Sequence, residues 1–401
     1  MTPDFAWADR GPAAFLLGLL NDTGEARFVG GCVRDSLLGR PPGPEGRTDI
    51  DIATTLAPDA VMELLTQAEV RCVPTGLEHG TVTAIIDHVP YEVTTLRRDV
   101  ETNGRHARVE FTRDWEADAG RRDFTINALY RDQSGQLYDY FGGQDDLAAA
   151  CVRFIGKPED RLREDFLRIL RFLRFSARYA EHLDTEGWSA CVAERAGLAS
   201  LSKERIWQEL QKIFSTPKAP MVLAAAKRDR VLREVFAQET DIDAFTAIHQ
   251  AQEGRVTPSL GLAALWPGAS PQGLEHAFRL SHADRDLAVM IHEARMALAE
   301  GASITDLLYR FGREAASLAY ELAVAISERP HTPVEAEALE NAIVPSFPFT
   351  GKDILAEGVA PGRQVGQILS AATDAWRRAG YPDDVDQCRD LLMAAIHHRS
   401  S

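Results

Sequence analysis

Residues 26–55 read ARFVGGCVRDSLLGRPPGPEGRTDIDIATT, in which an apolar strand, a glycine pair, a short helix and an Asp-Ile-Asp follow one another. If residues 48–52 are extended, Asp49 and Asp51 point to one face of a strand and the two isoleucines point to the other. Paired carboxylates can bind two divalent cations, which activate an attacking hydroxyl and stabilise a leaving pyrophosphate. This pattern predicts a nucleotidyl-transfer site.

The glycine pair, Gly30 and Gly31, precedes a helix that we expect at residues 32–38. Glycine lets the backbone approach a phosphate at a helix N-terminus, and Arg34 would add a positive charge nearby. By itself such a pair is more often an ordinary turn, and an Asp-x-Asp is common on solvated strand edges. Their combination, with isoleucines that indicate a half-buried strand, favours a phosphate and metal site.

The composition is that of a soluble globular protein, with 401 residues, 45% of them hydrophobic and 26% charged. Its five cysteines are scattered without a CxxC pair, which argues against a structural zinc site or disulfides and fits a cytoplasmic location. The apolar run at residues 13–20 is too short to span a bilayer, so we expect a helix there and no membrane association.

The net charge of −16 argues against a protein that coats nucleic acid nonspecifically, because its summed field would repel phosphate. An RNA substrate is still possible, since a local basic groove acts within one Debye length, about 8 Å at physiological salt.

The fold class that we expect is α+β and multidomain. Strands with β-branched residues at 80–86 and 91–96, and a helix at 57–68, indicate a head with a mixed sheet. After about residue 150 the strand signal ends, and helical spacing continues to the C-terminus. The expected domains are a catalytic head, a helical neck, a helical body and a helical tail, at residues 1–150, 151–216, 217–330 and 331–401.

Glu92 lies on the second of those strands, which could neighbour the Asp49 and Asp51 strand. It is therefore a candidate third catalytic carboxylate. The alternative is an exposed strand glutamate.

A second block, GRRDFTINAL, occupies residues 120–129. Arg121 and Arg122 offer bidentate donors for triphosphate oxygens, and Asp123 offers an acceptor for ribose hydroxyls. Asn127 can add a polar contact. Without the first block, this stretch would be interpreted as a charged surface turn.

A third block, EDFLRILRFLRF, occupies residues 164–175. On one continuous helix Glu164, Asp165 and Arg168 share a face, which Arg171, Arg174 and Arg178 extend. An Asp acceptor beside an Arg donor complements the edges of cytosine and adenine, whereas guanine and uracil present the opposite order. This pair can select CTP and ATP without a nucleic-acid template. The alternative is a solvated face with an i,i+4 ion pair.

Together these blocks resemble the class II tRNA nucleotidyltransferase and bacterial poly(A) polymerase family, within the polymerase-beta-like nucleotidyltransferases. The resemblance covers most of the chain and rests on five motifs in order, at residues 30–35 with 49–51, 121–123, 139–147, 164–168 and 201–210. It implies catalytic, metal-binding carboxylates at Asp49 and Asp51, a hinge at the third motif and an amino-acid template for the base at the fourth. The fifth is similar to a neck helix, for which Ser202 is the expected N-cap.

Two features favour CCA addition within the family. Residues 96–111 look like the flexible segment that CCA-adding members carry between the first two motifs, and the acidic chain lacks the basic extensions of poly(A) polymerases. Residues 351–369 are similar to the family's tRNA-holding region. Poly(A) addition and a non-catalytic RNA-binding protein are the alternatives; the paired carboxylates argue against the latter, because they would repel each other without a metal.

The resemblance and the residues thus predict an enzyme that adds C, C and A to the tRNA 3′ end from CTP and ATP with Mg²⁺, and no obligate protein partner. The expected nucleotide-binding residues are Gly30, Gly31, Arg34, Arg121, Arg122, Asp123, Asn127, Glu164, Asp165, Arg168 and Arg171. Candidate tRNA phosphate contacts are Lys203, Lys212, Lys227, Arg228, Lys352, Arg363, Arg377 and Arg378.

Overall fold

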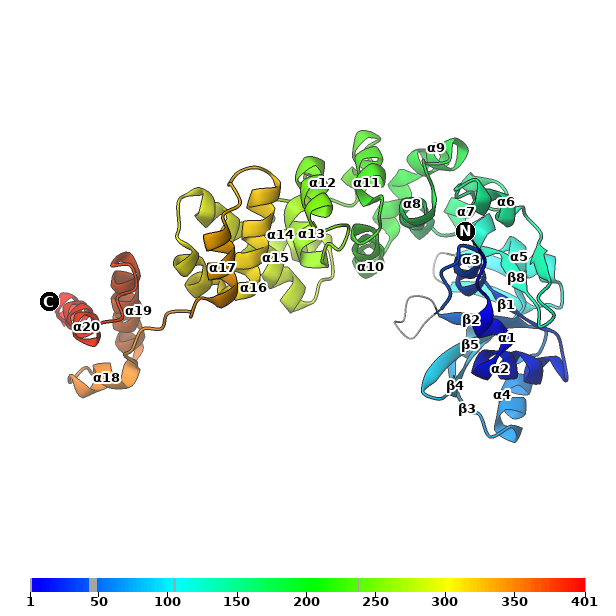
Figure 1. Cartoon of the computed structure of the whole chain (residues 1–401), viewed down its shortest axis with the longest axis horizontal. Coiled ribbons are helices and arrows are strands. Elements are labelled where there is room, and N and C mark those ends of the chain that lie inside the picture. The colour runs from blue at the N-terminus through cyan, green and yellow to red at the C-terminus, as the bar shows by residue number, and fades with distance from the viewer. Residues whose placement is uncertain (1, 43–48, 104–105, 237, 401) are drawn as a thin grey trace. The chain divides into compact units, whose positions relative to one another are not determined.

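The computed structural model describes residues 2–42, 49–103, 106–236 and 238–400. They form two compact units, one of Met1–Ile242 with His276–Arg279 and one of Asp243–Glu275 with Leu280–Ser401 (Figure 1). No helix in the described part of the chain is both long and apolar enough to cross a membrane. The finer division into four domains stays a prediction.

A mixed sheet organises the N-terminal half of the first unit. Among the described residues it has seven strands in the order β3-β4-β5-β2-β1-β8-β9, of which β2 and β5 are parallel and the other neighbours antiparallel. The strands are β1 Ala26–Val29, β2 Ile50–Thr54, β3 Arg71–Gly76, β4 Thr81–Ile86, β5 Val89–Thr95, β8 Leu129–Arg131 and β9 Leu137–Asp139. The α+β prediction is confirmed, as are the strands expected at 80–86 and 91–96.

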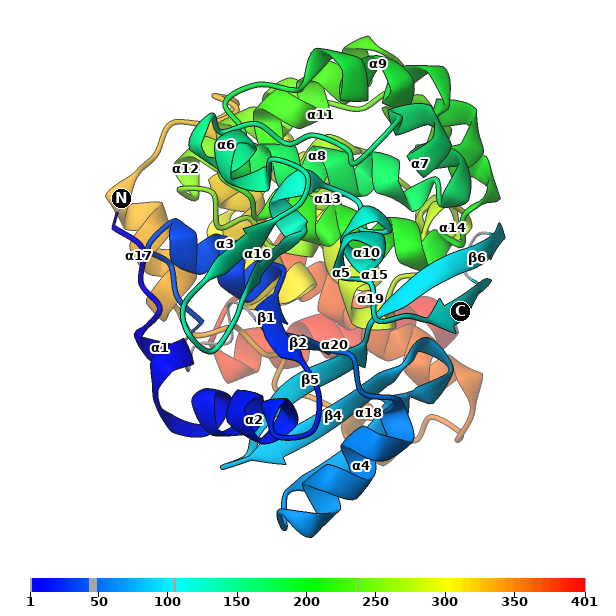
Figure 2. The ribbon, with the colours of Figure 1, turned by 90° about the vertical axis from the view of Figure 1, so that its right-hand side faces the viewer.

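The register of the sheet separates an apolar row from a polar one. Phe28, Ile52, Val93 and Val82 pair side by side across four strands, and all four are buried. Helices α2 (Gly11–Asn21) and α4 (Pro58–Gln67) pack against the sheet (Figure 2). One residue along, Asp51 pairs with Glu92, so the carboxylates lie in the adjacent row. Side chains alternate between the faces of a strand, and a core on one face leaves the other for the site.

The segment between the first two sequence blocks forms a separate antiparallel pair, β6 Arg97–Asn103 and β7 His106–Phe111. This pair corresponds to the stretch that resembles the family's flexible segment. Residues 104 and 105, between the two strands in the sequence, lie outside the described residues, as does residue 48 of the expected Asp49 and Asp51 strand. The strand itself begins at Ile50, so Asp49 immediately precedes it.

Besides α2 and α4, the first unit contains helices before, between and after the strands of the sheet. They are α1 Ala6–Asp9, α3 Gly31–Leu37, α5 Trp115–Gly120 and α6 Gly143–Ala148, followed by α7 Pro158–Glu164, α8 Leu167–Tyr179, α9 Thr185–Ala193, α10 Lys203–Phe214 and α11 Ala219–Arg228. Ser202 caps α10 by accepting a hydrogen bond from the Arg205 amide, as expected.

Aromatic packing fixes the second sequence block against α8. The ring centroid of Phe124 lies 5.0 Å from that of Phe154 and 5.2 Å from that of Phe175, and Phe154 stacks on Phe172 at 5.3 Å. Phe124 and Phe172 are fully buried. Such pairs stabilise by about 0.5–1.5 kcal/mol beyond their area burial. The cluster therefore holds Asp123, the neighbour of Phe124, close to the α8 arginines.

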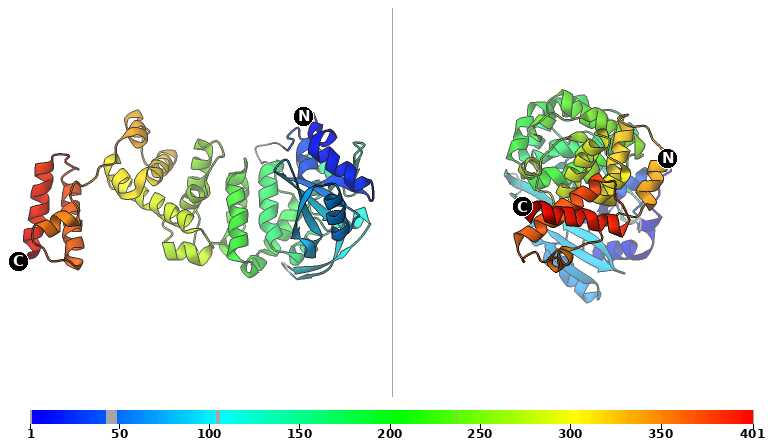
Figure 3. Two further views of the ribbon diagram at one scale, coloured as in Figure 1. Left: turned by 90° about the horizontal axis from the view of Figure 1, so that it is seen from below. Right: turned by 90° about the vertical axis from the view of Figure 1, so that its left-hand side faces the viewer.

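The rest of the chain is helical in the described residues (Figure 3). The helices are α12 Ile242–Ala251, α13 Pro258–Leu265, α14 Pro271–Ala277, α15 His282–Ala299, α16 Ile304–Ala325, α17 Pro333–Asn341, α18 Gly351–Ala356, α19 Arg363–Arg378 and α20 Val385–Ser400. The last three share a core that includes Ile354, Ile368, Ala372 and Leu392.

Candidate nucleotide-binding site

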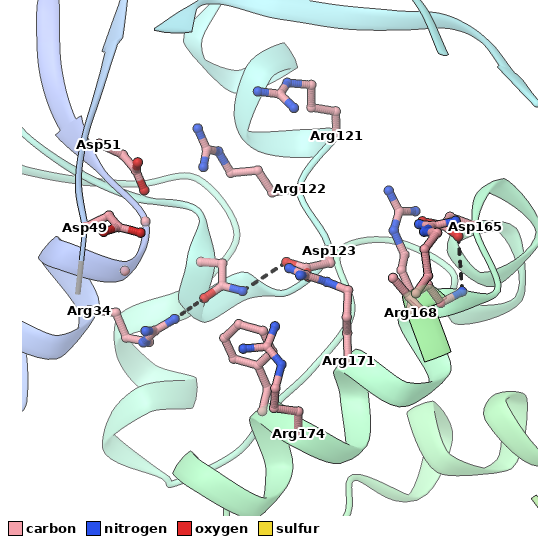
Figure 4. Close-up of a pocket in the computed structure, with 16 residues that line it drawn as sticks. Arg34, Asp49, Asp51, Arg121, Arg122, Asp123, Asp165, Arg168, Arg171 and Arg174 are labelled. Carbon is pink, nitrogen blue, oxygen red and sulfur yellow. Dashed lines mark hydrogen bonds and ion pairs between the residues drawn. The ribbon is translucent and has the colours of Figure 1, made fainter. Parts of the chain in front are cut away.

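A cavity of about 640 Å³ in the first unit brings the three sequence blocks together (Figure 4). Its lining contains seven arginines and four aspartates, an excess of positive charge that suits a polyphosphate. The lining residues are Gly30, Gly31, Arg34, Asp49, Asp51, Arg121, Arg122, Asp123, Asn127, Asp165, Leu167, Arg168, Arg171, Arg174, Phe175 and Arg205.

Two carboxylates form one side of the cavity (Figure 4). Asp51 is on β2 and half-buried, and Asp49 precedes the strand and is exposed. Burial raises the pKa of Asp51 to about 7, and the negative charges of Glu92 and Asp49 add to this against the opposing effect of Arg122. Negative charge is therefore concentrated where the strand enters the cavity.

The oxygen donors at this edge fit a divalent cation. Small hard cations such as Mg²⁺ are commonly held by one or two carboxylates together with substrate phosphates, and Asp49 and Asp51 supply two carboxylates. Among the residues that the structure describes, no three His, Cys, Asp or Glu side chains are grouped to hold a metal by themselves. Glu92 is exposed and outside the cavity lining, so its part as a third carboxylate stays a prediction.

Gly30 allows the backbone to turn beside these carboxylates. Its φ of 75° and ψ of −127° belong to a region that residues with a side chain rarely adopt. A Cβ at this position would lie 3.6 Å from Arg122 Nη1 and 3.9 Å from Asp51 Oδ2. The glycine therefore brings the start of α3 next to a carboxylate and an arginine at once.

Arg34 is buried and held in place by its neighbours. Its Nε donates to Asp35 Oδ1 at 2.9 Å, and its guanidinium lies 4.2 Å from the ring centroid of Tyr179. Tyr179 in turn donates to the same Asp35 oxygen at 2.9 Å. Arg34 Nη1 also donates to Asn127 Oδ1. The positive charge that the sequence predicted is thus fixed at the cavity wall.

Asp123 accepts hydrogen bonds from both sides. Asn127 Nδ2 donates to its Oδ1 at 2.9 Å, and Arg171 Nε donates to its Oδ2 at 2.8 Å. Burial alone would raise the pKa of Asp123, but the charge of Arg171 and the hydrogen bonds lower it to about 2. Asp123 is therefore ionised at neutral pH and connects the second block to α8.

The expected single helix over the third block is wrong. α7 ends at Glu164, Asp165 is extended with φ of −158°, and α8 begins at Leu167. The break occurs because Asp165 Oδ1 accepts from the Leu167 amide at 3.1 Å, a local hydrogen bond that competes with helix continuation. Asp165 Oδ2 accepts from Arg205 Nη2 at 2.6 Å.

Arg168 is oriented by groups on α7. It forms an ion pair with Glu164, and its Nη1 donates to the carbonyl oxygen of Arg161 at 2.7 Å. Glu164 itself lies outside the cavity lining. Asp165 and Arg168 both face the cavity, opposite the Asp49 and Asp51 side (Figure 4).

Besides the predicted nucleotide-binding residues, the cavity lining contains Leu167, Arg174, Phe175 and Arg205. Arg174 follows Arg171 at the helical i,i+3 spacing, which is how the sequence placed it on the face of the third block. Arg205 has no such local signal, since only the packing of α10 against α8 brings it to Asp165.

Comparison with known proteins places the chain in a family. A model of the poly(A) polymerase head domain matches residues 26–153. The mitochondrial CCA tRNA nucleotidyltransferase 1 of Danio rerio is 34% identical over 92% of this chain and 87% of the relative. The CCA-adding enzyme of Geobacillus thermodenitrificans is 40% identical over 50% of this chain and 48% of its own length.

A solved structure is similar over nearly the whole length. The Bacillus stearothermophilus CCA-adding enzyme in complex with CTP superposes with a TM-score of 0.78 and 28% identity, covering 97% of this chain and 98% of that one. The extent of both matches carries the assignment: this chain belongs to the family of CCA tRNA nucleotidyltransferases and bacterial poly(A) polymerases.

Proposed function

We propose that this chain is a CCA-adding tRNA nucleotidyltransferase, which adds C, C and A to the tRNA 3′ end from CTP and ATP without a nucleic-acid template. One observation carries the proposal: a single cavity has Asp49 and Asp51 on one side, Asp165 and Arg168 on the opposite side and arginines between them. A nucleoside triphosphate can lie across it, with phosphates at the carboxylates and the base at Asp165. The names of the family relatives support this assignment.

The phosphates of the nucleotide would be bound by Arg34, Arg121 and Arg122, because guanidinium groups match phosphate oxygens in pairs. Asp49 and Asp51 would hold Mg²⁺, which when bound lowers the pKa of the attacking hydroxyl and offsets charge on the leaving group. The 3′ hydroxyl of the tRNA attacks the α-phosphate, and pyrophosphate leaves. Asp123 would orient the ribose.

Base selection would fall to Asp165 and Arg168. Asp165 Oδ2 receives Arg205 and Oδ1 receives a backbone amide, yet each carboxylate oxygen can accept a second hydrogen bond. A cytosine or adenine amino group can donate to Asp165 while its ring nitrogen accepts from Arg168. Uracil or guanine would face these groups with donors and acceptors exchanged, which leaves polar groups unpaired at a cost of about 1–3 kcal/mol each.

The tRNA would extend from the cavity over basic side chains of the helices.

The scattered cysteines fit a cytoplasmic location, whereas some relatives are named as mitochondrial. Imaging of a tagged chain in cells would show in which compartment the protein lies.

Poly(A) addition is the second candidate, favoured by the head-domain match at residues 26–153. It predicts use of ATP without CTP and growth on RNA ends of any kind.

An incorporation assay tests the proposal. Each labelled nucleotide is offered singly to tRNA lacking its 3′ end and to a non-tRNA oligonucleotide, once with Mg²⁺ and once with a chelator. We expect CTP incorporation into tRNA only, lost with the chelator. ATP-only incorporation into both RNAs would instead establish the second candidate, and no incorporation would contradict both.

A further inference from the structure

Asp118 is a buried carboxylate outside the cavity that contacts two of its arginines. It lies on α5 and is 1% exposed. It is absent from the cavity lining and from the three sequence blocks. A buried carboxylate is costly unless it is fully paired, so its partners indicate what it does.

Both oxygens of Asp118 are engaged. Oδ1 accepts from Arg121 Nε at 2.8 Å and from the backbone amide of Arg97, the first residue of β6, at 3.3 Å. Oδ2 accepts from Arg122 Nη2 at 3.2 Å and from the Tyr130 hydroxyl at 2.8 Å. One side chain thus connects the start of the β6 and β7 pair, strand β8 and the two arginines of the second block.

The network continues through Tyr130 to Arg122, whose charge acts on Asp51. The Tyr130 hydroxyl accepts from Arg122 Nε at 3.2 Å while it donates to Asp118. Arg122 is therefore held from two directions. Its remaining nitrogen, Nη1, is the atom beside Gly30, and its charge opposes the rise in the pKa of Asp51.

Charge explains why a carboxylate is needed here. Arg121 and Arg122 are adjacent, with side chains only 16% and 19% exposed, and would repel each other if both turned inward without an anion. Burial would raise the pKa of Asp118, but Arg122 and Arg121 lower it to about 2. Asp118 is thus a fixed anion that permits both guanidinium groups to share one wall.

We propose that Asp118 is a positioning residue, which holds Arg121 and Arg122 at the places where they bind the triphosphate of the incoming nucleotide. The inference rests on the proposed function in that it takes the cavity as a nucleoside triphosphate site. It predicts a defect that depends on the phosphates of the ligand and is independent of the base.

A purely structural role for Asp118 predicts something else. Loss of a buried ion pair would then lower the stability of the head and weaken every ligand alike. Comparing ligands that share a base but differ in phosphate number separates the two, because only a positioning role discriminates between CTP and CMP.

The test uses the full chain and three variants. Asp118→Asn keeps the shape and removes the charge, and Tyr130→Phe removes one donor to Asp118 while keeping the ring. Asp114→Asn is the matched control on the same helix: Asp114 is the N-cap of α5, accepting from the Glu116 and Ala117 amides, and Asn caps equally well.

Dissociation constants for CTP and CMP with Mg²⁺, by calorimetry, are the primary measurement, with circular dichroism to verify folding. For Asp118→Asn we expect CTP binding about tenfold weaker, the order expected for the loss of a charge-assisted contact, and CMP binding within about twofold of the parent chain. In turnover the KM for both CTP and ATP should rise more than kcat falls. Asp114→Asn should behave as the parent.

Equal affinity of Asp118→Asn and the parent for CTP, or an equal loss for CTP and CMP, would overturn the inference. If Asp118→Asn does not fold, Tyr130→Phe decides: a smaller CTP-selective loss supports the inference, and unchanged CTP affinity overturns it. Failure of the proposed function would appear separately, as absence of tRNA extension by the parent chain that still binds CTP.

Discussion

Two aspartates that line the cavity have opposite electrostatic surroundings. Burial raises the pKa of Asp51 to about 7, and the negative charges of Glu92 and Asp49 add to this rise. Asp123, although also buried, is paired with Arg171, and its pKa falls to about 2. The neighbours of each side chain therefore decide its role, because Asp51 can gain a cation, while Asp123 is already neutralised and serves to position other groups.

Replacing Asp51 by Asn should lower nucleotide incorporation about a thousandfold or more, since the proposed metal ligand is lost. The thermal midpoint should stay the same or rise, because the substitution removes a repelled carboxylate. Extension assays and thermal unfolding measure the two effects. Asp59→Asn, at an exposed position of α4, is the control. Full activity in Asp51→Asn would refute the assignment of the carboxylate.

Stability at acid pH should depend on Asp123. Its folded pKa is depressed, so its contribution is present above the unfolded value of 3.8 and is lost as the pH falls toward about 2. A shift of this size corresponds to about 2 kcal/mol. In urea unfolding, Asp123→Asn should be less stable than the parent at pH 7, with the difference shrinking between pH 4 and 2. A difference that is constant with pH would contradict the pairing with Arg171.

At the scale of elements, the break between α7 and α8 is the feature on which the proposed base recognition depends. It frees Asp165 from the helix, and α10 contributes Arg205 to hold the carboxylate. Arg168 is oriented from the other side by Glu164. Each of the two side chains that we propose to read the base therefore has a partner from a different element.

Arg205→Gln should relax base selection, because Asp165 loses the donor that fixes its orientation. We expect weaker use of CTP and ATP, by about tenfold for a lost charged hydrogen bond, and increased incorporation of UTP or GTP. Glu204→Gln, an exposed neighbour on the same helix, is the control. Competition between the four nucleotides in single-turnover reactions measures the base selectivity. Unchanged selectivity would show that Arg205 has no part in base selection.

The spacing of apolar residues predicted the strands and helices whose own sequence has a regular pattern. It failed where contacts with distant residues determine the local structure. The strands of Val82 and Val93 and the helix of Val61 follow from their apolar spacing, and the core confirms them. The break at Asp165 was missed because an arginine-rich helical period runs through residues 164–175. Asp118 pairs with Arg121 and Arg122 at the local i,i+3 and i,i+4 spacings, but only tertiary packing brings the Tyr130 hydroxyl to it, as it brings Arg205 to Asp165.

At the scale of the whole molecule, a net charge of −16 coexists with a cavity rich in arginine. Long-range repulsion limits nonspecific RNA binding, while short-range contacts act where the acceptor end docks. The fold match over nearly the full length means that the helical units after the head are part of the same enzyme architecture.

Binding of tRNA should therefore weaken steeply with salt, since each phosphate contact releases counterions. A plot of log affinity against log salt for tRNA should be linear with a negative slope, whereas an unstructured RNA of equal length should bind weakly throughout. Fluorescence anisotropy from low to physiological salt measures both. Equal affinity for the two RNAs would contradict selective docking of tRNA.

The central claim is that this chain completes tRNA ends. The measurement that tests it most directly is sequencing of the 3′ ends of a tRNA lacking CCA after long incubation with the enzyme, Mg²⁺ and all four nucleotides at equal concentration. The account predicts ends that read CCA and stop after three additions. Long adenosine tails, mixed sequences or unextended ends would contradict it.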